Sequence, residues 1–222
     1  MVETAVQLVL LLVGAYLMGS IPTAQWLTRL LKGADLRRYG SGTVSASMVY
    51  EHVARWAVVP VGLFDMAKAA LPTWLGLSLG LGEPAAAAAG LAATAGHNWP
   101  VFLNFTGGRG LSGFMGTWLV LFPWGFPWML GFLAAGWLLG DSAPWALASL
   151  ATMPLLARAI GGPEIVAPAA VAMLLLTLIK RLEANRRPLP SPGPERRQVL
   201  LYRLFLDRDI ASHRDWIRRE PG

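Results

Sequence analysis

From residue 4 to residue 179 the chain is a succession of apolar segments separated by short stretches of glycine, proline or charged residues. Seven segments can be delimited, at 4–27, 56–81, 84–105, 111–122, 126–139, 145–160 and 165–179. Several are shorter than the roughly 20 residues that a bilayer normally requires, so tilt, or merging of the fourth and fifth, would change the count. The pattern predicts an all-α fold, a polytopic membrane helix bundle of about seven transmembrane helices.

The composition fits the same class. The mean hydropathy is +0.47 and only 14% of the residues are charged, whereas a soluble domain carries about 25%. The chain has no cysteine, which excludes disulfides and thiolate metal sites. The net charge of +6 could suggest nucleic-acid binding, but ten of the nineteen basic residues follow Lys180, in a segment expected to face lipid. We therefore expect a bilayer with anionic lipids as partner and no nucleic acid.

The distribution of charge predicts the orientation. The positive-inside rule places the loop after the first segment in the cytoplasm, because four basic residues follow at once: Arg29, Lys32, Arg37 and Arg38. The outside loops hold acidic residues, with Arg158 near a boundary as the exception: Glu3, Glu83 and Glu164. The N-terminus is then outside and the C-terminus cytoplasmic. The first segment lacks the basic n-region of a secretory signal, which predicts that it is retained as a membrane anchor. The expected location is the cell inner (plasma) membrane, which the chain crosses several times.

Two parts are predicted, a transmembrane domain over residues 1–182 and a tail over 183–222. The tail opens with a linker, because the proline-rich run 188–194 cannot sustain a helix. From Glu195 onward apolar residues alternate with many arginines, which predicts a basic amphipathic helix on the cytoplasmic leaflet. A helix docked on the protein's own loops is the alternative.

A glycine-rich loop follows the third apolar segment. Gly107, Gly108 and Gly110 can adopt backbone angles closed to other residues, so that successive N–H groups point into one concavity. Arg109 adds a planar cationic fork that matches phosphate or carboxylate oxygens. The loop therefore predicts an anion pocket beside the membrane. The alternative is a flexible loop whose arginine only obeys the positive-inside rule.

A second loop on the same predicted face, residues 40–47, is rich in small residues and hydroxyls. Hydroxyls and free backbone N–H groups can hold phosphate, so the two loops suggest one divided oxyanion site. Asp65 and Lys68 stand three residues apart and share a helix face. They form either a structural pair or part of the site, because ionisable groups at depth are usually paired or functional. His97 is either a site residue or a satisfied helix-end histidine.

Four stretches then carry a family resemblance. They are 15–22 (Ala-Tyr-Leu-Met-Gly-Ser-Ile-Pro), 35–42 with its Asp-Leu-Arg and Gly-Ser-Gly, 65–68 (Asp-Met-Ala-Lys) and 96–110. The third is similar to an Asp-x-x-Lys segment, and the fourth to a Gly-His-x-x-Pro-Val-Phe…Gly-Gly-Lys-Gly motif. Across about the first two-thirds of the chain, the sequence resembles a divergent member of the bacterial integral-membrane acyl-phosphate:glycerol-3-phosphate acyltransferases.

The resemblance implies an enzyme that acylates the 1-hydroxyl of glycerol 3-phosphate from acyl-phosphate and makes lysophosphatidic acid at the cytoplasmic face. It implies no metal, no other cofactor and no covalent acyl-enzyme. The implied catalytic residues are Ser41, His97 and Arg109. The implied phosphate-binding residues are Ser41, Gly42, Ser47, Gly107, Gly108, Arg109, Gly110 and Arg181. Supporting roles are expected for Asp65, Lys68 and Arg55.

The sequence also departs from the family pattern. Arg109 stands where the motif has lysine, and Arg181 where a third motif has histidine. In the first motif, Thr43, Ser45, Ser47 and Met48 replace the usual residues. Glu51 stands near an expected arginine and would repel phosphate unless Arg55 neutralises it. Two functions remain open on these residues: an active acyltransferase, or a degenerate non-catalytic member that binds lipid or phosphate at the cytoplasmic membrane face.

Overall fold

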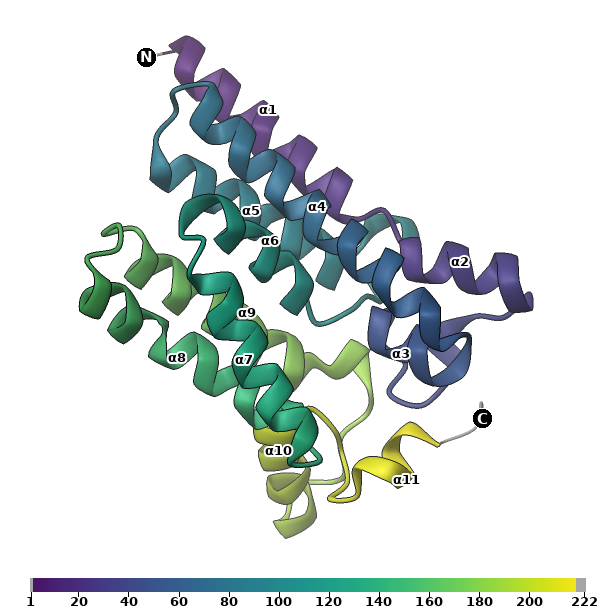
Figure 1. Cartoon of the computed structure of the whole chain (residues 1–222). Helices are drawn as coiled ribbons and strands as arrows, with labels where there is room; N and C mark the ends of the chain where they lie inside the picture. The colour runs from purple at the N-terminus through teal and green to yellow at the C-terminus, as the bar shows by residue number, and fades with distance from the viewer. Residues whose placement is uncertain (1, 219–222) are drawn as a thin grey trace.

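A computed structural model describes residues 2–218, and all the regular elements in this range are helices (Figure 1). Seven longer helices follow the predicted apolar segments: α1 (Val2–Gly19), α4 (Val58–Ser78), α5 (Glu83–Asn98), α6 (Leu111–Leu121), α7 (Gly125–Leu138), α8 (Ser142–Ile160) and α9 (Val166–Glu183). Shorter helices lie at one end of the bundle: α2 (Thr23–Lys32), α3 (Ala46–His52), α10 (Pro194–Leu206) and α11 (His213–Ile217). Four 3-10 turns connect them: η1 (Leu36–Arg38), η2 (Arg55–Ala57), η3 (Val101–Leu103) and η4 (Ala184–Arg186).

The helices pack in two groups that meet at α5 and α6. In one group α1 and α4 pack along α5, and α4 also packs along α6; in the other, α7, α8 and α9 form consecutive antiparallel pairs (Figure 1). The largest apolar core joins the groups and centres on the buried side chains of Phe114, Trp118, Met153 and Met173. Buried apolar side chains from α5 to α9 thus hold the second group against the first.

Small residues let α1 approach α5 closely. A Cβ atom on Gly19 would collide with the backbone of Ala93, and one on Gly96 would collide with the carbonyl of Tyr16. Close contacts at small residues are typical of helix pairs in membranes, where lipid tails supply no hydrophobic force between helices. The α1–α5 contact therefore depends on glycine from both sides.

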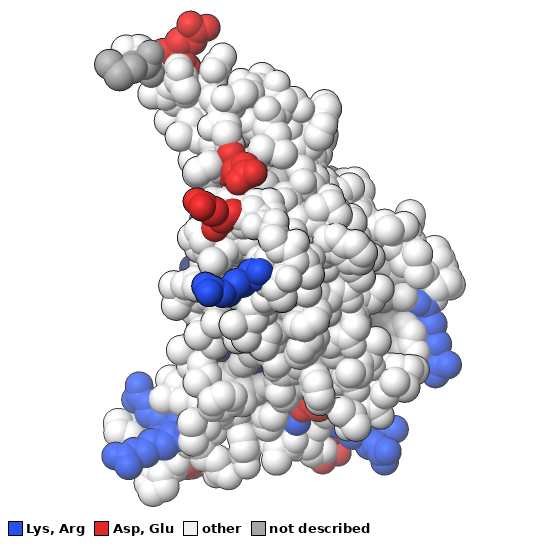
Figure 2. Space-filling model, turned by 60° about the vertical axis from the view of Figure 1, so that its left-hand side comes forward, with Lys and Arg blue, Asp and Glu red and all other residues white. Residues whose placement is uncertain are grey.

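The outer faces of the longer helices carry large exposed apolar side chains, among them Leu10, Leu63, Trp74, Trp137, Leu155 and Leu175. Figure 2 shows a broad uncharged surface between one end with acidic side chains and an opposite end with most of the lysines and arginines in view. By length and composition the stretch 2–32, which comprises α1 and α2, is apolar and long enough to cross a bilayer, and α6 and α7 are shorter apolar helices. So large an exposed apolar surface suits lipid better than water.

The first predicted segment, 4–27, is not one helix. Helix α1 ends at Gly19 and helix α2 begins at Thr23, and the chain changes direction between them (Figure 1). Pro22 explains the break, because its ring disfavours the helical conformation of the preceding residue, Ile21, and it has no N–H to donate. The expectation of a continuous segment is wrong here for that reason.

Two further boundaries differ from the expected ones. Helix α5 ends at Asn98 rather than near residue 105, because Pro100 follows and the chain enters the turn η3. Helix α9 continues to Glu183 rather than stopping at residue 179, and it buries Lys180 and Arg181 in its last turn. Both differences change where polar side chains lie, because the end of α5 carries His97 and the end of α9 carries Lys180 and Arg181.

The tail docks on the protein. Helix α10 packs against α8 and α9, and Trp216 of α11 is buried. Two ion pairs fix the turn after α10: Arg203 with Asp209 at 2.6 Å, and Arg208 with Asp141 at 2.7 Å. The docked alternative is thus what the structure shows, although the outer face of α10 still exposes Leu201 and Phe205.

Candidate functional site

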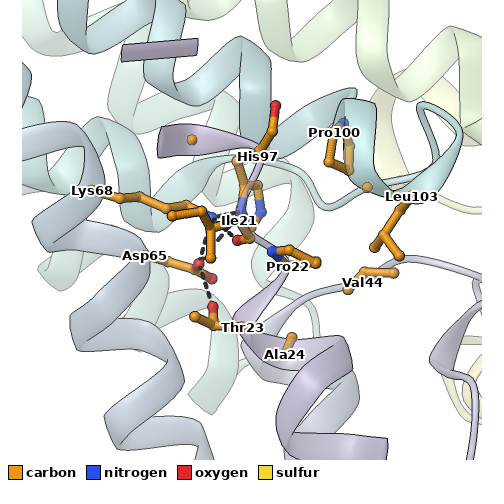
Figure 3. A pocket seen from close by; sticks show the side chains of 13 residues that line it. Ile21, Pro22, Thr23, Ala24, Val44, Asp65, Lys68, His97, Pro100 and Leu103 are labelled. Carbon is orange, nitrogen blue, oxygen red and sulfur yellow. Dashed lines mark hydrogen bonds and ion pairs between the residues drawn. The ribbon is translucent and has the colours of Figure 1, made fainter. Parts of the chain in front are cut away.

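Seven of the twelve predicted site residues line two neighbouring depressions at the basic end of the bundle. The first, called the histidine pocket here, is lined by Asp65, Lys68, His97 and Gly107, together with the α1–α2 break (Figure 3). The second, called the arginine pocket here, is lined by Ser41, Arg109 and Arg181, and by residues of the tail. The glycine-rich loop lies between them.

Lys68 is the centre of the histidine pocket. Its ammonium nitrogen lies 2.8 Å from Asp65 Oδ1, 2.9 Å from His97 Nδ1 and 3.3 Å from the carbonyl oxygen of Ile21. An ammonium group has three protons, so each of the three acceptors has one. The Ile21 carbonyl lies within reach because Pro22 interrupts the helix there. Asp65 also accepts a hydrogen bond from Thr23 at 3.2 Å, so the break and the buried ion pair support each other (Figure 3).

These contacts determine the form of His97. Because a lysine ammonium only donates, Nδ1 of His97 accepts from Lys68, which leaves the imidazole neutral with its proton on Nε2. The Asp65 carboxylate lies farther from Nδ1, at 3.5 Å. Nε2 faces the glycine-rich loop, since a Cβ atom on Gly108 would collide with it. His97 therefore offers a hydrogen-bond donor to that loop and to a ligand beside it.

The glycines are needed mainly for close approach. A side chain on Gly107 would strike the carbonyl of His97, and only Gly110, just before α6, has a positive φ, at 75°. Gly108 N–H donates to the His97 carbonyl at 3.1 Å, and Gly107 N–H donates to Asn185 at 3.4 Å. The predicted concavity of free N–H groups is therefore wrong for Gly107 and Gly108, because the protein itself uses both donors.

Arg109 enters the arginine pocket. Its Nε donates to the carboxylate of Asp207, at 2.8 and 2.9 Å from the two oxygens, and its Nη1 donates to the Lys180 carbonyl at 3.0 Å. The Ser41 hydroxyl lines the same pocket and lies 2.6 Å from the Thr43 hydroxyl. The structure thus brings Ser41 and Arg109 to one place, as predicted from the two loops.

Arg181 lines this pocket from the end of α9. Its Nη1 donates to the carbonyls of Leu204 and Phe205, and its Nη2 donates to the carbonyl of Ala143. These contacts attach the end of α10 to the bundle. Phosphate binding by Arg181 stays a prediction.

Sequence reasoning missed Asn185. Its side-chain amide donates to the carbonyls of Gly42 and Gly107, at 3.1 and 3.2 Å, and its oxygen accepts from Lys180 at 2.7 Å. It therefore joins the hydroxyl-rich loop, the glycine-rich loop and α9. Asn185 has a φ of 54°, in a region that asparagine tolerates better than most residues. The signal for it in the sequence is an asparagine just after the last apolar segment, where the third family motif also carries an asparagine.

Two predicted residues lie apart from both pockets. Ser47 is exposed on α3 and its hydroxyl lies 3.0 Å from that of Ser45. Arg55 is exposed in η2 and its guanidinium lies over the ring of Tyr50. Among residues 2–218, Glu51 forms no ion pair with Arg55, since α3 ends between them. No cluster of three or more metal-ligand side chains occurs in this range.

Comparisons with known proteins identify the family of the chain. The sequence model of the family described as glycerol-3-phosphate acyltransferase matches residues 9–189. The chain is 34% identical over 220 residues to glycerol-3-phosphate acyltransferase 5 of Dehalococcoides mccartyi, covering 96% of this chain and 94% of that protein. It is 34% identical over 191 residues to the glycerol-3-phosphate acyltransferase of Synechococcus sp., covering 81% and 93%.

A solved structure shares the fold. The crystal structure of PlsY (YgiH), an integral membrane glycerol 3-phosphate acyltransferase, in its glycerol 3-phosphate form, superposes with a TM-score of 0.72 and 27% identity, covering 82% of this chain and 91% of that one. The family model spans both predicted phosphate-binding loops, the hydroxyl-rich loop over residues 40–47 and the glycine-rich loop. The chain therefore belongs to the glycerol-3-phosphate acyltransferase family of integral membrane proteins.

Proposed function

We propose that this protein transfers a fatty acyl group from acyl-phosphate to the 1-hydroxyl of glycerol 3-phosphate and so forms lysophosphatidic acid for phospholipid synthesis. The observation that carries the proposal is the meeting of Ser41, His97 and Arg109 around one glycine-rich loop in a chain of this family. Two solved structures of PlsY (YgiH) support it, one described in a glycerol 3-phosphate form and the other in a lysophosphatidic acid form.

The chemistry fits the groups present. In acyl-phosphate the leaving group is already good, so the protein must mainly orient two phosphate-bearing substrates and stabilise charge at the acyl carbonyl. The bond from the carbonyl carbon to the glycerol oxygen forms as the bond to the phosphate oxygen breaks, and the proton of the 1-hydroxyl leaves with the released inorganic phosphate. In this proposal Arg109 and Ser41 bind phosphate, and the Nε2 proton of His97 stabilises the developing oxyanion or a phosphate oxygen.

The proposed setting is the cytoplasmic face of the cell inner (plasma) membrane. Most of the lysines and arginines in the view of Figure 2 lie at the end of the bundle opposite the acidic one, and the two pockets lie at that basic end. Positive charge favours the cytoplasmic side and its anionic lipids. Both substrates are polar at the phosphate, so a site at this end can receive them from the cytoplasm.

The test uses the full-length protein in detergent or lipid nanodiscs. Acyl-phosphate and glycerol 3-phosphate are supplied, and lysophosphatidic acid is followed by mass spectrometry, with acyl-coenzyme A and acyl-carrier protein as alternative donors. Arg109→Ala should lower kcat/KM by roughly 10- to 150-fold, because a charge-assisted contact is worth about 1.5–3 kcal/mol. Arg158→Ala, an exposed arginine outside both pockets, is the matched control and should change little.

The outcomes separate the two functions left open by the sequence. Product from acyl-phosphate, and a loss in Arg109→Ala alone, supports the proposal. A folded protein that makes no product from any donor is the degenerate, phosphate-binding relative instead. If product forms only from another donor, acyl-phosphate is not the donor, but the acylation of glycerol 3-phosphate still stands.

A further inference from the structure

Asp207 reaches the site from outside the region that defines the family. The family model ends at residue 189, and the tail that follows folds back so that Asp207 lies against Arg109. The contact joins residues 98 positions apart. It is largely shielded from water, with side-chain exposures of 13% for Arg109 and 22% for Asp207. A carboxylate at this place needs an explanation, because the neighbouring groups are suited to bind anions.

The contact uses one particular nitrogen of Arg109. Both oxygens of Asp207 lie near Nε, and the Lys180 carbonyl accepts from Nη1. Within the described part of the chain, Nη2 has no hydrogen-bond partner. The guanidinium is thus held at two nitrogens while the third keeps its two donors for a ligand. This geometry fixes the plane of the guanidinium group.

Asp207 does not take the position expected of a substitute for phosphate. A carboxylate or phosphate that binds arginine strongly uses two parallel hydrogen bonds to two different nitrogens. Here the two carboxylate oxygens converge on Nε alone. The contact therefore resembles a support for the arginine more than an occupant of its binding edge.

The backbone around Asp207 is held in place on both sides. Asp207 follows α10 in the left-handed region, with a φ of 56°, which aspartate tolerates better than most residues with a side chain. Arg181 binds the carbonyls just before it, and the Arg203–Asp209 and Arg208–Asp141 ion pairs fix its neighbours. The turn thus presents the Asp207 carboxylate in a fixed position.

We propose that Asp207 is a positioning residue that holds Nε of Arg109 so that Nη2 is presented to a substrate phosphate, which makes the C-terminal tail a part of the active site. This inference rests on the proposed role of Arg109 as a phosphate-binding residue. Arginine suits such an arrangement because it has separate donors for the support and for the ligand. A lysine has a single nitrogen and cannot divide these tasks in the same way.

The test is a double-mutant cycle on the full chain. Asp207→Asn should raise the Kd for glycerol 3-phosphate and the Kd for inorganic phosphate, both measured by calorimetry, by about 10-fold. The KM for glycerol 3-phosphate should rise by the same factor. In an Arg109→Lys background, where no Nε–H exists, Asp207→Asn should change the same constants less than about 2-fold. Asp207→Glu should restore part of the affinity.

Asp215→Asn is the matched control, because Asp215 is an exposed carboxylate of the tail that lines neither pocket and forms no ion pair within residues 2–218. Its effect should be equal in both backgrounds. Melting temperature and membrane yield, measured for each variant, detect a merely structural loss.

Three outcomes would overturn the inference. A tighter Kd in Asp207→Asn would show that the carboxylate competes with substrate. An equal effect of Asp207→Asn with and without Arg109→Lys would show a structural role only. Wild-type protein that binds no phosphate compound would refute the anion pocket itself. By contrast, wild-type binding and a coupled loss in Asp207→Asn without any turnover would leave this inference standing and refute the proposed function.

Discussion

At the scale of single residues, Lys68 decides which nitrogen of His97 carries the proton. The nitrogen of Lys68 has three acceptors around it, and its side chain is only 3% exposed. Without Lys68, the buried Asp65 carboxylate would lack a positively charged partner. The imidazole ring of His97 could then rotate, because nothing would hold its Nδ1. The sequence leaves open whether this ion pair within α4 is structural or functional. In the structure Lys68 fixes the orientation of His97, and a part for the pair in the reaction stays a prediction.

We expect Lys68→Met to lower kcat/KM on the order of 10²-fold, since small displacements of a site group have effects of that size. The companion variant Asp65→Asn/Lys68→Met removes both charges, so that no unpaired buried carboxylate can unfold the protein. It should keep the melting temperature closer to wild type and still show the loss. Lys32→Met, an exposed lysine that binds the His52 carbonyl, is the control. Full activity in the double variant would contradict the role assigned to Lys68.

At the scale of elements, the site depends on where helices stop. The break between α1 and α2 releases the Ile21 carbonyl toward Lys68, and the end of α5 at Asn98 turns the chain into the glycine-rich loop. The end of α9 brings Lys180 beneath Arg109 and leads to Asn185. Interrupted helices with polar ends are a recurrent way to build polar sites at membrane depth.

The α1–α5 contact gives a prediction at this scale. Gly96→Ala adds a Cβ atom where the Tyr16 carbonyl already lies, so the two helices must separate. Overpacking of this kind typically destabilises by about 1–3 kcal/mol, and we expect a lower melting temperature together with reduced activity, since His97 is the next residue on α5. Gly14→Ala on α1, where a Cβ would have no neighbour within 4 Å, is the control. Equal melting temperatures for both variants would argue against close packing there.

At the scale of the whole molecule, most of the outer surface is uncharged, and most of the lysines and arginines in the view of Figure 2 gather at the end of the bundle away from the N-terminus. The basic end holds both pockets and the docked tail. The orientation of the protein in the membrane therefore determines from which side substrates reach the site. The predicted orientation, with the N-terminus outside and the C-terminus cytoplasmic, puts both loops of the site on the same side.

Cysteine labelling tests this orientation, and the absence of native cysteine makes the background clean. A cysteine at the exposed Ser47 should react with an impermeant maleimide only in inverted vesicles, and one at the exposed Glu83 or Glu164 only in intact cells. Activity of each variant shows that it is folded. Labelling of Ser47→Cys and Glu83→Cys from the same side would rule out the proposed topology.

The sequence by itself determined the helices, the class of the molecule and the loops that carry the site. Hydropathy, glycine, proline and charge act over a few residues, so α4 to α9 lie close to their predicted segments, and Ser41 and Arg109 were found from local pattern and resemblance. Even the departures at Pro22 and Pro100 have local causes that the sequence displays.

Only the tertiary structure decided which polar groups meet. The Lys68–Ile21 contact spans 47 positions, the Arg109–Asp207 contact spans 98, and Asn185 binds Gly42 across 143. No periodicity or spacing encodes such contacts, because they depend on how whole helices pack and where the tail docks. The form of His97, the use of glycine N–H groups by the protein and the place of Asp207 all follow from those long-range contacts.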